Sequence, residues 1–153
     1  MSLIATKSNA DSGGRAINAL LDSHQVQNSN FHVFTSLGSA RYLSAMRYAS
    51  AVVGNSSSGL YEAPIFGVPV VNVGDRQKGR LCPDNVINCR LTFDDIVSSV
   101  KKAISDDFTR IARQAKNPYG SGETSQSIMG HIKAYLESGQ AAAPLAKSFY
   151  DIT

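Results

Sequence analysis

The sequence is poor in the residues that hold metals or build disulfide frameworks. Cys82 and Cys89 are its only two cysteines, and neither has a His or Cys companion at the spacing of a metal motif. No window is apolar for the length of a membrane span, and the N-terminus lacks the pattern of a secretory signal. We therefore expect reduced thiols, a cytoplasmic protein with no membrane partner, and no bound metal.

Two further features narrow the function class. No Gly-x-Gly-x-x-Gly follows the first expected strand, and residues 12–15 lack that spacing, which disfavours a nicotinamide dinucleotide fold. The net charge of +3 and the pI near 9.0 raise the question of nucleic acid. However, the basic residues are scattered except between Arg76 and Arg80, and no stacking aromatics lie among them. The sequence predicts a small anionic ligand, no nucleic-acid partner and no cofactor.

The length and the composition indicate one domain. With 153 residues, 42% of them hydrophobic, the chain is long enough to bury a core. It has no low-complexity tract, internal repeat or interdomain linker, so residues 1–153 are expected to form a single domain. Residues 1–3 are interpreted as a cloning-derived start, fused to an internal point of a longer protein.

Short apolar runs alternate with amphipathic stretches along the chain. Strands are predicted at residues 3–6, 31–34, 51–53, 69–73 and 86–89, and helices at 15–24, from 39, after 59, from 93, at 108–115 and at 123–137. Asp11 is expected to cap the first helix, and Ile104 to face the sheet. The tail from Pro144 to Ile152 is apolar for a terminus. The pattern predicts an α/β fold, a Rossmann-like parallel sheet flanked by helices.

The stretch from Ser50 to Arg80 is the most informative part of the chain. Its two strands and the helix between them form a βαβ unit, so both loops after these strands open on one edge of the sheet. The first loop, residues 56–59, has three serines and a glycine where backbone N–H groups at a helix start favour an anion. The second loop brings Arg76 to the same edge. This convergence predicts a phosphate site, although ordinary N-capping by serine explains the first loop equally well on local pattern.

Longer motifs in this stretch resemble a known family. The residues are Gly-Asn-Ser-Ser-Ser-Gly at 54–59, Glu62, Phe-Gly-Val-Pro at 66–69, Val-Asn-Val-Gly at 71–74 and Asp-Arg-Gln-Lys-Gly-Arg at 75–80. Together with residues 8–14 and Asn-Pro-Tyr-Gly at 117–120, they resemble the C-terminal half of hydrolysing UDP-N-acetylglucosamine 2-epimerases, from about Thr6 to the C-terminus. The similarity is greatest to the bacterial branch that serves sialic and legionaminic acid synthesis. It implies the C-terminal domain of a two-domain enzyme of the GT-B type.

The resemblance implies that Ser57, Ser58 and Gly59 hold the diphosphate of UDP. Glu62 would accept hydrogen bonds from the ribose diol, although an acid that complements a helix dipole is chemically indistinguishable there. Arg76 would add positive charge near the diphosphate.

Three more residues take binding roles from the resemblance. The main-chain groups of Ser36 and Leu37 would read the uracil ring, and Asn9 would lie at the nucleotide-sugar site. Lys78 and Arg80 are equally compatible with a role in the binding site and with a solvated role on the surface.

The reaction implied is removal of UDP from a UDP-N-acetylhexosamine by anti elimination, followed by addition of water, which gives the C2-inverted free sugar. Positioned donors around the leaving diphosphate stabilise its growing charge. The general base and acid would come from a missing N-terminal domain, so no catalytic residue is assigned here. His24 and His131 lie in expected helices. Asp106 and Asp107 are interpreted as a helix-start pair. The chain alone is expected to be inactive, and the full-length protein to be a homo-oligomer.

Two alternatives remain open at this stage. A GT-B glycosyltransferase also binds a nucleotide sugar at this edge, although it would be expected to have a more acidic sugar-reading motif at residues 75–80. A stand-alone nucleotide-binding module without catalysis is the other.

Overall fold

The computed structural model describes residues 2–9, 12–120 and 122–138. The expected cap Asp11 and the apolar tail from Pro144 to Ile152 lie outside the described residues. The chain divides into two compact units, residues 1–116 and residues 117–153, and each is considered by itself.

The first unit contains all the expected strands in the expected order. Its elements are β1 (Leu3–Thr6), α1 (Gly14–Gln27), β2 (Phe31–Phe34), α2 (Gly38–Tyr48), β3 (Val52–Gly54), α3 (Ser58–Tyr61), α4 (Ala63–Phe66), β4 (Val70–Val73), β5 (Val86–Cys89), α5 (Phe93–Ala103) and α6 (Asp106–Gln114). Asp106 and Asp107 begin α6, as expected of a helix-start pair.

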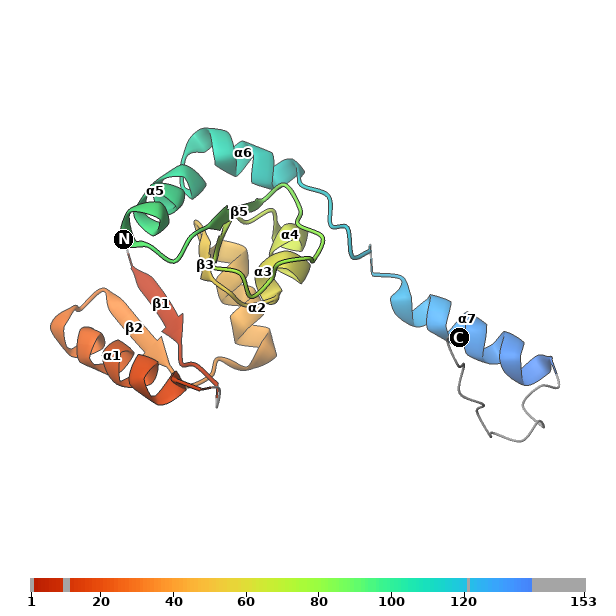
Figure 1. Cartoon of the computed structure of the whole chain (residues 1–153). Coiled ribbons are helices and arrows are strands. Elements are labelled where there is room, and N and C mark those ends of the chain that lie inside the picture. Colours follow the sequence, from red (N-terminus) through yellow and green to blue (C-terminus); the bar gives the residue numbers. More distant parts are fainter. Residues whose placement is uncertain (1, 10–11, 121, 139–153) are drawn as a thin grey trace, which may run out of the picture. The chain divides into compact units, whose positions relative to one another are not determined.

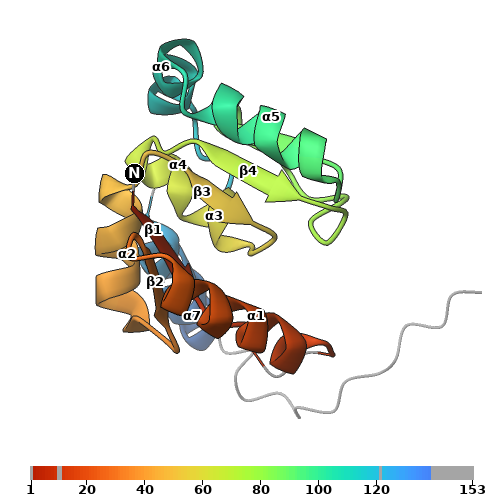
Figure 2. The same ribbon diagram turned by 90° about the vertical axis from the view of Figure 1, so that its left-hand side faces the viewer.

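The strands are parallel and helices flank them, which confirms the Rossmann-like fold class. The strands form two sheets rather than one: β1 pairs with β2, and β3, β4 and β5 pair in that order. No pairing joins the two sheets within the described residues, and Leu3 and Ile4 keep 46% and 55% of their surface exposed. In Figure 2, β1, β2 and α1 form a group of their own, apart from β3 and β4. A continuous sheet would require β1 to pair with the short edge strand β3. Here the strands of each βαβ unit pair with each other instead.

The core lies on both faces of the three-stranded sheet. On one face, Val70 of β4 packs with Met46 of α2 and Ala63 of α4. On the other face, the neighbouring Val71 packs with Ala103 of α5, as expected when successive side chains of a strand point to opposite faces. Figure 1 shows α5 and α2 on different sides of this sheet. Helices on both faces of the sheet therefore hold β3, β4 and β5 in place.

Two details of the helices differ from the expectations. Ile104 was expected to face the sheet, but α5 ends at Ala103, and Ile104 is the C-cap residue with 43% of its surface exposed. The single helix expected after Gly59 is two short helices, α3 and α4, which meet at Glu62. Proline in the first turn of α4 supports a new helix start, because its missing N–H would have no helical partner there.

The turn after α4 requires glycine. Gly67 has φ of 64°, and a Cβ at this position would lie 2.9 Å from the Cα of Arg113 in α6. This left-handed residue reverses the chain into β4, as glycine commonly does after a helix.

The second unit contains α7 (Thr124–Glu137), and His131 lies within it, as expected. None of the residues of α7 is buried, and one stripe of the helix is apolar: Ile128, Met129, Ile132, Tyr135 and Leu136. Among the residues that the structure describes, no helix is both long enough and apolar enough to cross a membrane.

Candidate functional site

Residues 55–58, named here the serine loop, connect β3 to α3 at the carboxyl end of the sheet. The hydroxyl of Ser56 accepts hydrogen bonds from the backbone N–H of Ser58 at 3.4 Å and from the Ser58 hydroxyl at 3.1 Å. Ser57 occupies the N-cap position of α3 but makes no side-chain capping hydrogen bond. N-capping by Ser57 therefore does not explain its place in the loop, and its hydroxyl is available to a ligand.

Gly59 has a structural reason to be glycine. Its position is buried, and a Cβ there would lie 2.8 Å from Cγ1 of Val70 in β4. Its backbone N–H donates to the carbonyl oxygen of Ser56 at 3.2 Å. This N–H is therefore engaged within the loop, whereas the sequence suggested that it would be free for a ligand. Close packing of α3 on β4 is enough to require glycine, and a ligand role for Gly59 stays a prediction.

The loop after β4 reaches across to the serine loop, as the sequence predicted. Nε2 of Gln77 donates to the carbonyl oxygen of Asn55 at 2.6 Å, and the Arg76 guanidinium lies at the same oxygen, 3.5 Å away. Because β3 and β4 are parallel neighbours, both loops leave the sheet at one edge. The sequence pattern did not mark Gln77, which is only 6% exposed, because a glutamine among charged residues gives no sign of burial.

Glu62 lies at the junction of α3 and α4 and not in the first turn of a helix. Its N–H donates to the Ser58 carbonyl oxygen at 2.9 Å, and its side chain makes no capping hydrogen bond to α4. Glu62 is both the C-cap residue of α3 and the N-cap residue of α4, so the dipole-complementing role considered from the sequence stays open at the start of α4.

The two remaining cations of the loop differ in their surroundings. Arg80 donates to the Tyr61 hydroxyl at 3.1 Å, and its guanidinium lies 5.6 Å from the centre of the Tyr61 ring, whereas Lys78 is exposed.

A cavity of about 350 Å³, named here the β2 cavity, opens at the carboxyl ends of β1 and β2. Ser36 and Leu37 line it, and the Ser36 hydroxyl accepts a hydrogen bond from the N–H of Gly38 at 3.2 Å. Leu37 is the residue before α2, so its main-chain groups stand at a helix start. The structure therefore brings these two predicted residues into one cavity.

Tyr42 joins the β2 cavity to the serine loop. Its side chain lines the cavity, and its hydroxyl lies 2.6 Å from the Ser58 hydroxyl. The Tyr42 ring also packs against the core cluster of Met46, Ala63 and Val70, so the hydroxyl is held by a fixed ring. From the sequence, Tyr42 was read only as part of an apolar helix stripe. A polar tip on a core aromatic usually finds a hydrogen-bond partner, and this rule could have singled it out.

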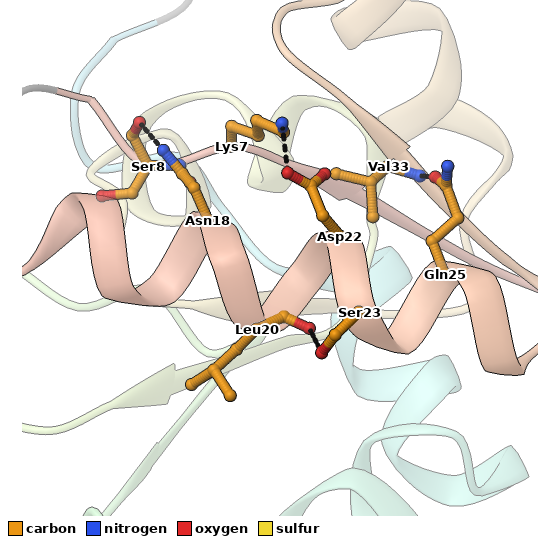
Figure 3. Close-up of polar contacts among 8 residues, drawn as sticks. All are labelled: Lys7, Ser8, Asn18, Leu20, Asp22, Ser23, Gln25 and Val33. Atoms are coloured by element: carbon orange, nitrogen blue, oxygen red, sulfur yellow. Dashed lines mark hydrogen bonds and ion pairs between the residues drawn. The ribbon is translucent and has the colours of Figure 1, made fainter.

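Polar contacts with α1 fasten the loop after β1 (Figure 3). The Asn18 side chain accepts from the backbone N–H of Ser8 at 2.8 Å and donates to its carbonyl oxygen at 3.3 Å. Lys7, which lines the β2 cavity, pairs with Asp22 at 2.8 Å. Asn9 follows this fastened segment but is exposed and does not line the cavity, so it is the predicted residue that the structure leaves apart from the others.

Arg90 donates a side-chain hydrogen bond that lowers the pKa of Asp95, and the same pair raises the pKa of Arg90. Within the described ranges, no group of three or more His, Cys, Asp or Glu side chains could hold a metal ion. The arrangement provides hydroxyl donors, backbone groups and a guanidinium, which suit an anionic ligand.

Comparison with known proteins decides the family. The family model described as UDP-N-acetylglucosamine 2-epimerase matches residues 1–133. The chain belongs to this family. The resemblance drawn from the serine loop and the loop after β4 is thereby confirmed at the level of the family.

Curated members of the 2-epimerase family are similar over most of the chain. It is 45% identical over 108 residues to a Campylobacter jejuni GDP/UDP-N,N'-diacetylbacillosamine 2-epimerase (hydrolyzing), with 70% of the chain and 28% of the relative covered. It is 32% identical to the Escherichia coli polysialic acid biosynthesis protein P7, over 95% of the chain and 36% of that protein. The chain therefore spans about a third of the length of these relatives.

Solved structures of 2-epimerases have the same fold. A crystal structure of a UDP-N-acetylglucosamine 2-epimerase superposes with a TM-score of 0.61 at 18% identity, covering 97% of the chain and 44% of that structure. A Listeria monocytogenes structure solved under the same enzyme name gives a TM-score of 0.69 at 17% identity, covering 97% of the chain and 39% of the other.

Proposed function

We propose that this chain is the UDP-binding half of a hydrolysing UDP-N-acetylhexosamine 2-epimerase. The observation that carries the proposal is the bridge from Tyr42 to Ser58, which links the β2 cavity to the serine loop. A nucleoside diphosphate has a planar base at one end and a negatively charged diphosphate at the other. The cavity and the loop offer one surface for each of these ends.

The proposed roles follow the geometry. Main-chain groups of Ser36 and Leu37 bind the uracil ring in the β2 cavity. The hydroxyls of Ser57 and Ser58 donate to the diphosphate, and Arg76, already at the serine loop, supplies positive charge.

Two further roles are proposed nearby. The Glu62 carboxylate, which follows Ser58 by one helical turn, accepts hydrogen bonds from the ribose diol. Gly59 and Asn9 keep the roles given by the family resemblance, the first beside the diphosphate and the second at the nucleotide-sugar site.

The proposed division of labour leaves the proton transfers elsewhere. In the elimination, the bond between the sugar and the diphosphate breaks, and UDP leaves with an added negative charge. Donors that hold this charge lower the barrier, and that is the contribution proposed for this half. Removal of the C2 proton and the later addition of water need an acid and a base, which we assign to an N-terminal domain that closes over the site. The whole enzyme is proposed to act on a UDP-linked N-acetylated sugar and to release UDP and the C2-inverted free sugar.

The experiment is a UDP-release assay with UDP-N-acetylglucosamine and with its diacetamido relative. We expect no turnover by the chain alone, and turnover when the N-terminal half of a full-length relative is added. Ser58→Ala should then lower turnover in the mixture, because the hydroxyl beside the diphosphate is lost. Turnover by the chain alone that disappears in Glu62→Gln would place the catalytic acid in this half and contradict the proposal.

A further inference from the structure

Residues 7–9, named here the β1 exit, leave β1 along one face of α1. Gly14, Asn18 and Asp22 are spaced four residues apart, so they lie one above another on the same face of this helix. The structure pairs each of them with one residue of the β1 exit: Asp22 with Lys7, Asn18 with Ser8, and Gly14 with Asn9. Figure 3 shows the first two of these contacts. Three successive turns of α1 therefore hold three successive residues of the chain.

Asn18 holds both backbone groups of a single residue. Its Oδ1 accepts from the N–H of Ser8 at 2.8 Å, and its Nδ2 donates to the Ser8 carbonyl oxygen at 3.3 Å. Because one planar amide meets both groups, the backbone on each side of Ser8 is fixed in orientation relative to α1. An apolar contact would pack the helix against this segment but would not set that orientation.

Gly14 lets the β1 exit approach the helix closely. A Cβ at this position would lie 2.5 Å from the carbonyl oxygen of Asn9 and 3.2 Å from Oγ of Ser8. Any other residue would push the β1 exit away from α1. Loops at the carboxyl ends of parallel strands often carry function on a rigid scaffold, so a loop held this firmly indicates a role in ligand binding.

Lys7 is the residue that the β1 exit contributes to the β2 cavity. Within the described part of the chain, it is the only charged residue in the lining of this cavity. An ammonium group has three N–H donors, and Asp22 accepts from one of them at 2.8 Å, which leaves donors for a ligand. Because Asp22 also balances the charge of Lys7, the cavity suits a neutral acceptor oxygen better than it suits a diphosphate.

We propose that Lys7 is a further nucleotide-binding residue, which donates from its ammonium to an oxygen of the nucleoside in the β2 cavity, and that Asn18 positions it through the β1 exit. The inference rests on the proposed function, because it takes the nucleoside to lie in this cavity. Lys7 adds a side-chain contact to a site for which the main-chain groups of Ser36 and Leu37 are proposed. Asn18 is a positioning residue, since it contacts Ser8 and not the nucleotide.

The variant Lys7→Met removes the ammonium and keeps a side chain of similar length. It should weaken binding of UDP and of uridine by the same factor, about tenfold, because the lost contact is to the nucleoside that both ligands share. Titration of the isotope-labelled chain, followed by nuclear magnetic resonance, measures both dissociation constants. Lys101→Met, at an exposed lysine of α5 outside the cavity lining, is the matched control and should bind both ligands as the wild type does.

The outcomes separate this inference from the proposed function. Wild-type binding of both ligands by Lys7→Met would overturn the inference, and so would a loss for UDP without a loss for uridine, which would place Lys7 at the diphosphate. The proposed function stands in either case. Failure of the wild-type chain to bind UDP would overturn the proposed function, and the role of Lys7 with it.

Two further variants test the ion pair and the positioning residue. Asp22→Asn breaks the same ion pair but keeps the ammonium, so it should cost less uridine affinity than Lys7→Met; an equal loss would show that the ammonium itself does not contact the ligand. Asn18→Leu should weaken uridine binding in the wild-type chain and add little to the loss in Lys7→Met, because it acts through Lys7. Additive losses, in variants with a wild-type unfolding transition, would contradict the positioning role.

Asn18→Asp is the conservative variant at this position. It retains an oxygen that accepts the 2.8 Å bond from the N–H of Ser8, so it should keep more uridine affinity than Asn18→Leu does. Equal losses for the two variants would show that this hydrogen bond does not position Lys7.

Discussion

Replacing Tyr42 by phenylalanine removes one oxygen from the bridge between the β2 cavity and the serine loop. The ring remains, so its packing against Met46, Ala63 and Val70 is unchanged. The lost contact is the 2.6 Å hydrogen bond to the Ser58 hydroxyl. Without it, that hydroxyl retains only its 3.1 Å bond to Ser56 and is free to rotate away from the diphosphate.

The expected size of the effect follows from one hydrogen bond between neutral groups. Such a bond contributes about 0.5–1.5 kcal/mol net, which corresponds to a change of roughly three- to tenfold in a dissociation constant. Tyr42→Phe should therefore weaken UDP binding by about this factor. Binding of uridine should be unaffected, because uridine has no diphosphate to contact Ser58.

Isothermal titration calorimetry with UDP and with uridine measures this difference. The control is Tyr48→Phe, on the same helix but 81% exposed, which should bind both ligands as the wild type does. If Tyr42→Phe binds UDP with wild-type affinity and Ser58→Ala has lost UDP binding, then Tyr42 does not position Ser58 for the ligand. Equal losses for UDP and uridine would indicate a general disturbance of the β2 cavity instead.

Three predictions concern stability and are measured by thermal or denaturant unfolding. Asn85→Ala should destabilise the fold by about 1–3 kcal/mol, because Asn85 is fully buried and its Nδ2 donates to the Val68 carbonyl at 2.8 Å; a change below half a kcal/mol would contradict this. Gly67→Ala should cost more than about 1 kcal/mol, since the new Cβ meets the Arg113 backbone at a positive φ, and an unchanged Tm would refute the left-handed turn. Arg90 lowers the pKa of Asp95 in the folded state, so this pair stabilises the fold above the unfolded pKa and the benefit is lost as pH falls through the folded pKa. The Tm of Asp95→Asn should therefore lie below that of the wild type at neutral pH, and the two should converge in acid; a constant gap would show that the pair does not titrate in this way.

The sequence predicted the strands and helices because the tendency to form each one depends on the residues within it. Apolar runs such as Val70–Val73 became strands, and the pairing of β3 with β4 placed the two loops at one edge, as a right-handed βαβ unit requires. The contact of Arg76 and Gln77 with Asn55 follows from that topology. For the same reason, the family could be inferred from motifs that lie in these two loops.

The parts that the sequence did not predict depend on contacts distant in the chain. Tyr42 and Ser58 are 16 residues apart, and nothing in the helix stripe around Tyr42 marks its hydroxyl as a partner for the serine loop. Burial of Gln77 depends on the position of Asn55, 22 residues away. The break between α3 and α4 at Glu62 and the separation of the strands into two sheets are likewise decided by packing and not by local pattern.

The central claim, that UDP binds across the β2 cavity and the serine loop, is tested most directly by a nuclear magnetic resonance titration of the isotope-labelled chain. UDP is added to millimolar concentration at low salt, with CMP as the matched nucleotide. The proposal predicts UDP-dependent shifts of the amide signals of Leu37, Ser57, Ser58 and Glu62, which weaken as salt is added. If those four signals stay in place at millimolar UDP while the fold remains intact, the nucleotide site is not where we have placed it.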